Sequence, residues 1–263
     1  MTDTIMLTKN TDQLRQQVAA HVAADSIAKG IYWDEGNKRG CFIGCLAHSE
    51  DPGINEQTYG LPVMVQRIAE SIFEALSDDE AKAFFAALPD AVGCDGKDLS
   101  KVGWQFLAAE LRALPAQTAE IQVVIDPVIA GIDLLASGQE WAVADAAADA
   151  DAAWAAAADA AAWAADAAAC AARAAAAARA DWAADAAAWA ADAAACAARA
   201  AAAARADWAA DAADAADAAA WAARAAACAA RAAAAADADA RRRQRDTLLA
   251  LISQAPVLEG GND

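Results

Sequence analysis

The sequence predicts an all-α protein in which a small helical head domain is followed by a very long alanine-rich helical tail. No stretch of useful length alternates apolar and polar residues as a half-buried strand would. The 263-residue chain has no glycine or proline between Gly138 and Pro256, and alanine, the best helix former, fills most of that stretch. Residues 142–240 are almost only Ala, Asp, Trp, Arg and Cys, unlike an ordinary globular domain. The predicted parts are a helical globular head at 1–138, a repeat tail at 139–253 and a flexible C-terminus at 254–263.

Capping and turn residues place the helices of the head. Ser77, with Glu80 three residues later, forms a capping box that opens a helix. Pro62 fits the first turn of a helix, and Gly30 ends the first helix of the chain. We expect Pro127 to kink or open the last segment of the head. The predicted helices cover residues 11–29, 41–49, 62–76, 78–88 and 99–114, and the predicted loops cover 31–40 and 51–60.

A 26-residue spacing repeats in the tail, as between Trp163 and Trp189. Within one copy the large and charged residues step by three and four, which is the spacing of a heptad seam. Asp166 is seven residues from Arg173, too far to pair on one helix, so we expect its partner on another helix. The predicted interaction seam consists of Trp163, Asp166, Cys170, Arg173, Trp182, Asp185, Trp189, Asp192, Cys196, Arg199, Trp208, Trp221, Arg224, Cys228 and Arg231.

The tail can be arranged in two ways. It can be a long rod that associates in a coiled-coil-like bundle, or a folded-back bundle of antiparallel helices. A straight helix over residues 139–253 would be about 170 Å long at about 1.5 Å per residue. Asp181 and Asp207 could cap the helices of a folded-back form. The lack of turn-forming residues favours the rod, with the bundle as the alternative.

The head contains one cluster of residues with metal-binding chemistry. On a helix, the spacing of Cys41, Cys45 and His48 by four and three residues would place them on one face. These side chains could hold zinc, with Cys94 or His21 as a fourth ligand. The alternative is that two small buried cysteines and a hydrogen-bonded histidine pack a short helix. Because no acid or oxyanion-stabilising element accompanies the cluster, we expect a protein that is not an enzyme.

The charge of the chain restricts its partners and its location. A formal net charge of −18 disfavours nucleic acid, because phosphate contacts need clustered Lys and Arg. The basic run at 241–245 complements a helix C-terminus instead. Recurring aspartates exclude a membrane span through the tail, and no signal-peptide core opens the chain. Six cysteines without such a signal predict free thiols in the cytoplasm.

The segment GCFIGCLAHS, followed by NEQTYGLP and an amphipathic helix, resembles a group of uncharacterised proteins from bacteriophages and bacterial genomes. Those proteins carry a Gly-Cys-x-x-Gly-Cys-x-x-His head and an alanine-rich tail of variable length. The resemblance covers residues 30–115 and the style of the tail, although this tail holds more Trp, Asp and Cys. It implies a phage or prophage setting in a host bacterial cell, and no particular activity. The matching residues are Gly40, Cys41, Gly44, Cys45, His48, Glu56, Gly60, Leu61 and Pro62.

Together these observations predict a non-enzymatic protein–protein interaction or structural protein of phage or prophage origin. Its helical tail would mediate self-association or spacing. Its partner would be a helical protein surface, either of a second copy in a homo-oligomer or of a host protein. Two other interpretations stay open: a metal-binding or enzymatic head centred on the Cys41, Cys45 and His48 cluster, with zinc as cofactor, and an acidic mimic of nucleic acid.

Overall fold

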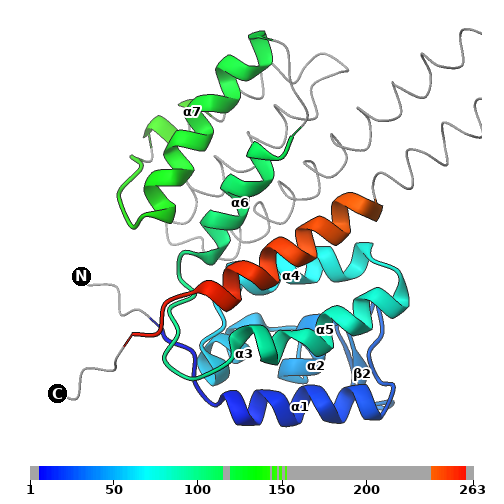
Figure 1. Cartoon of the computed structure of the whole chain (residues 1–263). Helices are drawn as coiled ribbons and strands as arrows, with labels where there is room; N and C mark the ends of the chain where they lie inside the picture. Colours follow the sequence, from blue (N-terminus) through cyan, green and yellow to red (C-terminus); the bar gives the residue numbers. More distant parts are fainter. Residues whose placement is uncertain are drawn as a thin grey trace, which may run out of the picture.

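Helices make up most of the residues that the structure describes, which confirms the all-α prediction at this coarse level. The structure is a computed structural model and describes residues 6–114, 119–142, 144–146, 148–149, 152 and 238–258 (Figure 1). Strands β1 (Trp33–Asp34) and β2 (Arg39–Gly40) pair antiparallel in a short hairpin. The helices are α1 (Thr11–Ala23), α2 (Phe42–Ala47), α3 (Pro52–Tyr59), α4 (Val63–Ala75), α5 (Asp78–Val92), α6 (Val102–Arg112), α7 (Ala119–Ala136) and a C-terminal helix at 238–254. None of the helices within these residues is long and apolar enough to cross a membrane.

Most predicted helices of the head are present, and tertiary contacts shift their ends. The capping box of α5 forms as predicted, with the Ser77 amide and hydroxyl both donating to Glu80 Oε2. In contrast, α1 ends at Ala23 rather than near residue 29. Asp25 adopts a left-handed φ of 49°, and the chain then turns so that Ile27 forms a β-bridge with Gly40. A contact between distant segments therefore overrides the local helix signal.

The predicted loop at 51–60 is wrong, because residues 52–59 form α3. Pro52 stands at the start of this helix, and Asp51 caps it by accepting a hydrogen bond from the Gly53 amide at 2.8 Å. Gly60 ends the helix with a φ of 69°. Pro127 was expected to kink or open its segment. It lies inside α7, and the helix continues past it to Ala136.

The core of the head is centred on four phenylalanine rings from α2, α4 and α5. The ring centroid of Phe42 lies 5.3 Å from that of Phe84, 5.6 Å from that of Phe85 and 6.1 Å from that of Phe73. All four side chains are at most 1% exposed. Aromatic pairs of this kind stabilise a fold by about 0.5–1.5 kcal/mol beyond the burial of their area. Phe42 thus fixes the position of the short helix α2 in the core. This also positions Cys41, which precedes the helix, and His48, which follows it.

The C-terminal helix, residues 238–254, packs into this same core. Figure 1 shows the helix, in orange and red, lying beside α4. Leu248 is 0% and Ile252 is 1% exposed, and both belong to one apolar cluster with Phe42 and Phe84. The structure therefore places residues 238–258 with the head, where the sequence predicted the end of the tail. The sequence predicted helix here but not its place in the head, although the larger side chains recur one turn apart at Gln244, Leu248 and Ile252.

The segment before residue 153 is anchored in the core as well. After α7, Trp141 is 5% exposed and lies against Gly131, where a Cβ atom would come within 2.1 Å of the indole. Trp141 belongs to the same apolar cluster as Ile252. Residues on both sides of 153–237 therefore belong to one core. One straight helix over 139–253, about 170 Å long, is incompatible with this common core.

Candidate functional site

The three residues predicted to bind zinc lie around α2 but do not share a helical face. Cys41 precedes the helix in an extended conformation, with φ −77° and ψ −169°. His48 follows the helix with a left-handed φ of 52°. Cys45 alone lies within α2. The spacing argument fails because two of the three residues have non-helical backbone angles, and their side chains reach different neighbours.

Cys45 and the glycines of the Gly-Cys-x-x-Gly-Cys motif serve packing. The Cys45 thiol is fully buried and donates to the Gly40 carbonyl oxygen at 3.1 Å. Burial raises the pKa of this thiol to about 12, so it remains protonated at neutral pH. A Cβ atom at Gly44 would lie only 1.4 Å from the carbonyl oxygen of Tyr32. The motif therefore allows the chain before β1 to lie directly against α2.

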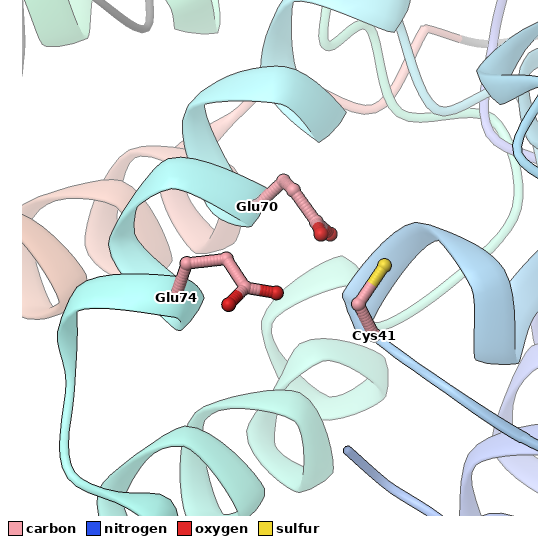
Figure 2. Close-up of side chains that lie close together, drawn as sticks. All are labelled: Cys41, Glu70 and Glu74. Atoms are coloured by element: carbon pink, nitrogen blue, oxygen red, sulfur yellow. The ribbon is translucent and has the colours of Figure 1, made fainter. Parts of the chain in front are cut away.

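Cys41 faces two carboxylates that project from α4. Figure 2 shows Glu70 and Glu74 on this helix and the Cys41 thiol across from them at the start of α2. Among the residues that the structure describes, these three are the group of Cys, His, Asp and Glu ligand atoms that all lie within 4.8 Å of one another. Glu70 Oε2 accepts a hydrogen bond from the Ile43 amide at 3.0 Å, and Glu74 accepts one from the Gly30 amide. Both carboxylates thus bind backbone amides.

The environment of this cluster keeps its protons in place. Burial, together with the Glu70 charge, raises the pKa of the Cys41 thiol far above its usual value. Burial also raises the pKa of Glu70. A thiol that stays protonated is a poor nucleophile, so Cys41 does not have the character of a catalytic cysteine. A cation would have to displace the thiol proton and compete with the Ile43 amide, in the first turn of α2, for Glu70 Oε2.

On another side of α2, His48 meets His21 from the last turn of α1. Their Nε2 atoms are 3.0 Å apart. Gln17 Nε2 lies 3.2 Å from His21 Nε2 and 2.6 Å from His48 Nε2. The same amide nitrogen donates to the Cys45 carbonyl oxygen at 2.9 Å. Three side chains and one backbone carbonyl therefore converge at this point.

Aromatic contacts and a serine fix the two imidazole rings. Trp33 stacks on His48 with ring centroids 4.3 Å apart and contacts His21 edge-on at 5.8 Å. His21 Nδ1 lies 2.7 Å from the Ser26 hydroxyl oxygen. His21 is 7% exposed, and burial, followed by the charge of His48, lowers its pKa. The His21 ring is therefore neutral near pH 7, with one nitrogen free of a proton.

The sequence identified the two histidines but missed the residues that position them. Gln17 could have been found, because it precedes His21 by one helical turn. Ser26 reaches His21 across the turn that follows α1, and Trp33 approaches both rings through a tertiary contact that leaves no local signal. Cys94, considered as a fourth zinc ligand, is exposed and joins no such group among the described residues.

The predicted interaction seam, from Trp163 to Arg231, lies outside the described residues and stays a prediction. The phage-like resemblance also stays a prediction. Comparison of the chain with protein-family models, with curated proteins and with solved structures found no match.

Proposed function

We propose that the protein is a non-enzymatic interaction protein whose head holds both ends of an alanine-rich segment, residues 153–237, and presents it to a helical surface. The observation that carries this proposal is that Trp141, before the segment, and Ile252, after it, belong to one apolar core. A segment attached at both ends has already lost part of the chain entropy that binding would otherwise remove. Anchoring of this kind favours recognition by the segment.

Hydrogen bonds also hold the C-terminal helix, residues 238–254, to the head. Lys97 is 7% exposed, and its ammonium group donates to the carbonyl oxygens of Ile252 at 3.2 Å and Ser253 at 2.7 Å. Gln244 donates to Glu110 Oε2 at 3.0 Å. These contacts set the register of the C-terminal helix on the head. They therefore also fix the position of residue 238, which directly follows the alanine-rich segment.

The sequence of the segment supplies the interaction chemistry. Tryptophans at heptad positions within one copy of the repeat, as at Trp182 and Trp189, would give among alanines an apolar stripe that soluble monomers seldom expose. The seam also carries both signs of charge, as at Asp166 and Arg173, so it is complementary to itself. We therefore take a second copy of the chain as the first partner to test. Charged residues beside such a seam select partner and register.

Charge reversal in the full-length protein tests this proposal. One variant carries Asp166→Arg and Asp192→Arg, and a second carries Arg173→Asp and Arg199→Asp. If the seam pairs between copies, each variant alone dissociates to a lower mass, and an equimolar mixture regains the wild-type mass. Sedimentation equilibrium over a range of concentrations measures all three samples.

The matched control carries Asp181→Arg and Asp207→Arg, which make the same charge change outside the seam; because both residues could also cap helices of a folded-back form, the control is compared by mass alone, which should stay that of the wild type. A wild-type monomer at every concentration would overturn pairing between copies. If the four substitutions combined in one chain then restored the helix content lost in each pair, the seam would instead join two parts of the same chain. If no variant changed mass or helix content, the interaction seam itself would be rejected.

A further inference from the structure

The hydrogen bonds of Gln17 limit which ring nitrogens of His21 and His48 can carry a proton. Its amide nitrogen carries two hydrogens, and one is used by the Cys45 carbonyl oxygen. The other can reach one imidazole nitrogen, and His48 Nε2 at 2.6 Å is the nearer. That bond requires a bare lone pair on His48 Nε2. The same nitrogen lies 3.0 Å from His21 Nε2.

Ser26 determines which nitrogen of His21 carries the proton. Its hydroxyl lies 3.3 Å from the backbone carbonyl oxygen of His21 and donates to it. In the tautomer that follows, the hydroxyl oxygen accepts from His21 Nδ1 at 2.7 Å, and His21 Nε2 carries no proton. Histidines that bind metals commonly donate their second ring nitrogen to such a partner, which fixes the tautomer and the ring orientation. In this arrangement neither Nε2 atom carries a proton, and an ion between the rings would take the place of the Gln17 hydrogen bond to His48 Nε2.

The spacing of the two nitrogens fits one ion. With metal–nitrogen bonds of about 2.0–2.1 Å, nitrogens 3.0 Å apart subtend about 95° at the ion. This angle suits neighbouring positions in a tetragonal or octahedral complex, and a small opening of the pair would give a tetrahedral one. His48 is exposed, so water can reach the ion and complete its coordination. Trp33, stacked on His48, holds the ring in place whether or not an ion is present.

We propose that His21 and His48 form a binding site for a divalent transition-metal ion, with both Nε2 atoms as neighbouring ligands. Imidazole nitrogens suit Zn²⁺, Ni²⁺ and Cu²⁺ and do not suit Mg²⁺ or Ca²⁺. The site differs from the Cys41, Glu70 and Glu74 cluster, where an ion would have to displace a thiol proton and two backbone amides, whereas here it displaces one side-chain amide, that of Gln17. It is independent of the proposed role of the alanine-rich segment.

Calorimetric titration of the full-length, chelator-treated protein with Zn²⁺ and Ni²⁺ tests the site. We expect one ion per chain. His48→Asn removes one ligand, and asparagine tolerates the left-handed backbone at this position. The variant should weaken binding by more than the roughly 10–100-fold expected for the loss of an outer-shell partner. Ser26→Ala removes only the outer-shell partner of His21 and should weaken binding by about 10–100-fold.

Two controls separate this site from the thiols. Glu74→Gln alters the neighbouring cluster and should leave the affinity unchanged, and a circular dichroism melt of each variant checks its fold. X-ray absorption at the zinc edge should show nitrogen or oxygen near 2.0–2.1 Å rather than sulfur near 2.3 Å. Absence of binding, binding that His48→Asn does not weaken, or a sulfur shell around zinc would each overturn the proposal.

Discussion

The two flanks of the alanine-rich segment are held to the head in different ways. Before the segment, α7 packs on α6, and Trp141 covers Gly131. Among the residues of this flank that the structure describes, Asp133 forms an exposed ion pair with Arg112, and the Ser137 carbonyl oxygen accepts a long hydrogen bond from Lys101. After the segment, residues 238–258 combine buried apolar side chains with hydrogen bonds to α5, to α6 and to the chain between them. We call these the exit flank, residues 119–152, and the return flank, residues 238–258.

The difference shows how a helix with an alanine-rich beginning can still be fixed in register. Apolar contact alone tolerates small shifts, because it is not directional. Hydrogen bonds require donor and acceptor at set distances, and the return flank has them at Lys97 and at Gln244. It also forms a β-bridge between Lys97 and Val257. We infer that the return flank sets the position of the segment and that the exit flank adds apolar stability.

The largest expected effect is the loss of apolar contact on the return flank. Leu248→Ala removes a fully buried side chain beside Phe42 and Phe84. A change of this kind lowers the free energy of unfolding by about 2–5 kcal/mol. Urea denaturation measures it, and Leu258→Ala, at an exposed residue of the same flank, should change little. Equal effects of the two substitutions would contradict the packing of this helix in the core.

The second effect tests the polar contacts of the return flank. Lys97→Met keeps most of the side-chain volume but removes the donor to Ala91, Ile252 and Ser253. Because hydrogen bonds from a charged group are strong and the carbonyl groups lose their partner, we expect a loss of about 2–3 kcal/mol. Trypsin should also cut the 241–245 arginine run faster, since the helix end is released.

The matched substitution for Lys97 is Lys101→Met. The ammonium group of Lys101 reaches a carbonyl oxygen of the exit flank, that of Ser137, at 3.4 Å. This contact is long and exposed, so its removal should leave both the stability and the trypsin cleavage rate close to wild type. A loss as large as that of Lys97→Met would show that the two flanks do not differ in their polar anchoring.

The third effect tests the exit flank. In Gly131→Ala the new Cβ atom would come within 2.1 Å of the Trp141 indole, so the ring or α7 must move. Overpacking of this kind lowers stability by about 1–3 kcal/mol. Adding Trp141→Leu makes room for the methyl group, so the second substitution should lower stability less in the Gly131→Ala background than in the wild type. Strictly additive losses in denaturation would contradict the contact.

Local signals in the sequence predicted the helices of the head better than their packing. The α5 capping box was correct because its two partners, Ser77 and Glu80, are three residues apart. The predicted end of α1 was wrong because Ile27 forms a β-bridge with Gly40, a contact that no local sequence rule detects. The return flank was assigned to the tail because composition, rather than the spacing of Leu248 and Ile252, decided the boundary.

The candidate site was predicted only in part, because local spacing does not show which side chains meet in the fold. Spacing grouped Cys41, Cys45 and His48 on one helix, but α2 is six residues long and two of them lie outside it. Which partner each side chain reaches depends on the neighbouring elements. Cys41 meets Glu70 from α4, and His48 meets His21 from α1. A pairing between separate elements leaves no periodic pattern to detect.

The smallest expected effect concerns two carboxylates that bind the return flank with opposite pH dependence. The Ser77 hydroxyl, followed by Arg242, lowers the pKa of Glu80 to about 2 from the usual 4.5. Its stabilising effect is therefore complete above pH 4.5 and disappears as the pH falls toward 2. Because the pair with Arg242 is exposed, we expect Glu80→Gln to cause only a small loss at neutral pH.

Glu110 should behave in the reverse way. Burial raises its pKa, so ionisation opposes folding as the pH rises above 4.5. Glu110→Gln keeps a partner for the Gln244 amide and removes this penalty. Relative to wild type, the stability of Glu110→Gln should therefore increase between pH 4 and pH 7, while that of Glu80→Gln decreases over the same range. Urea denaturation at the two pH values measures both differences, and parallel changes would show that Glu110 is not desolvated beneath the C-terminal helix.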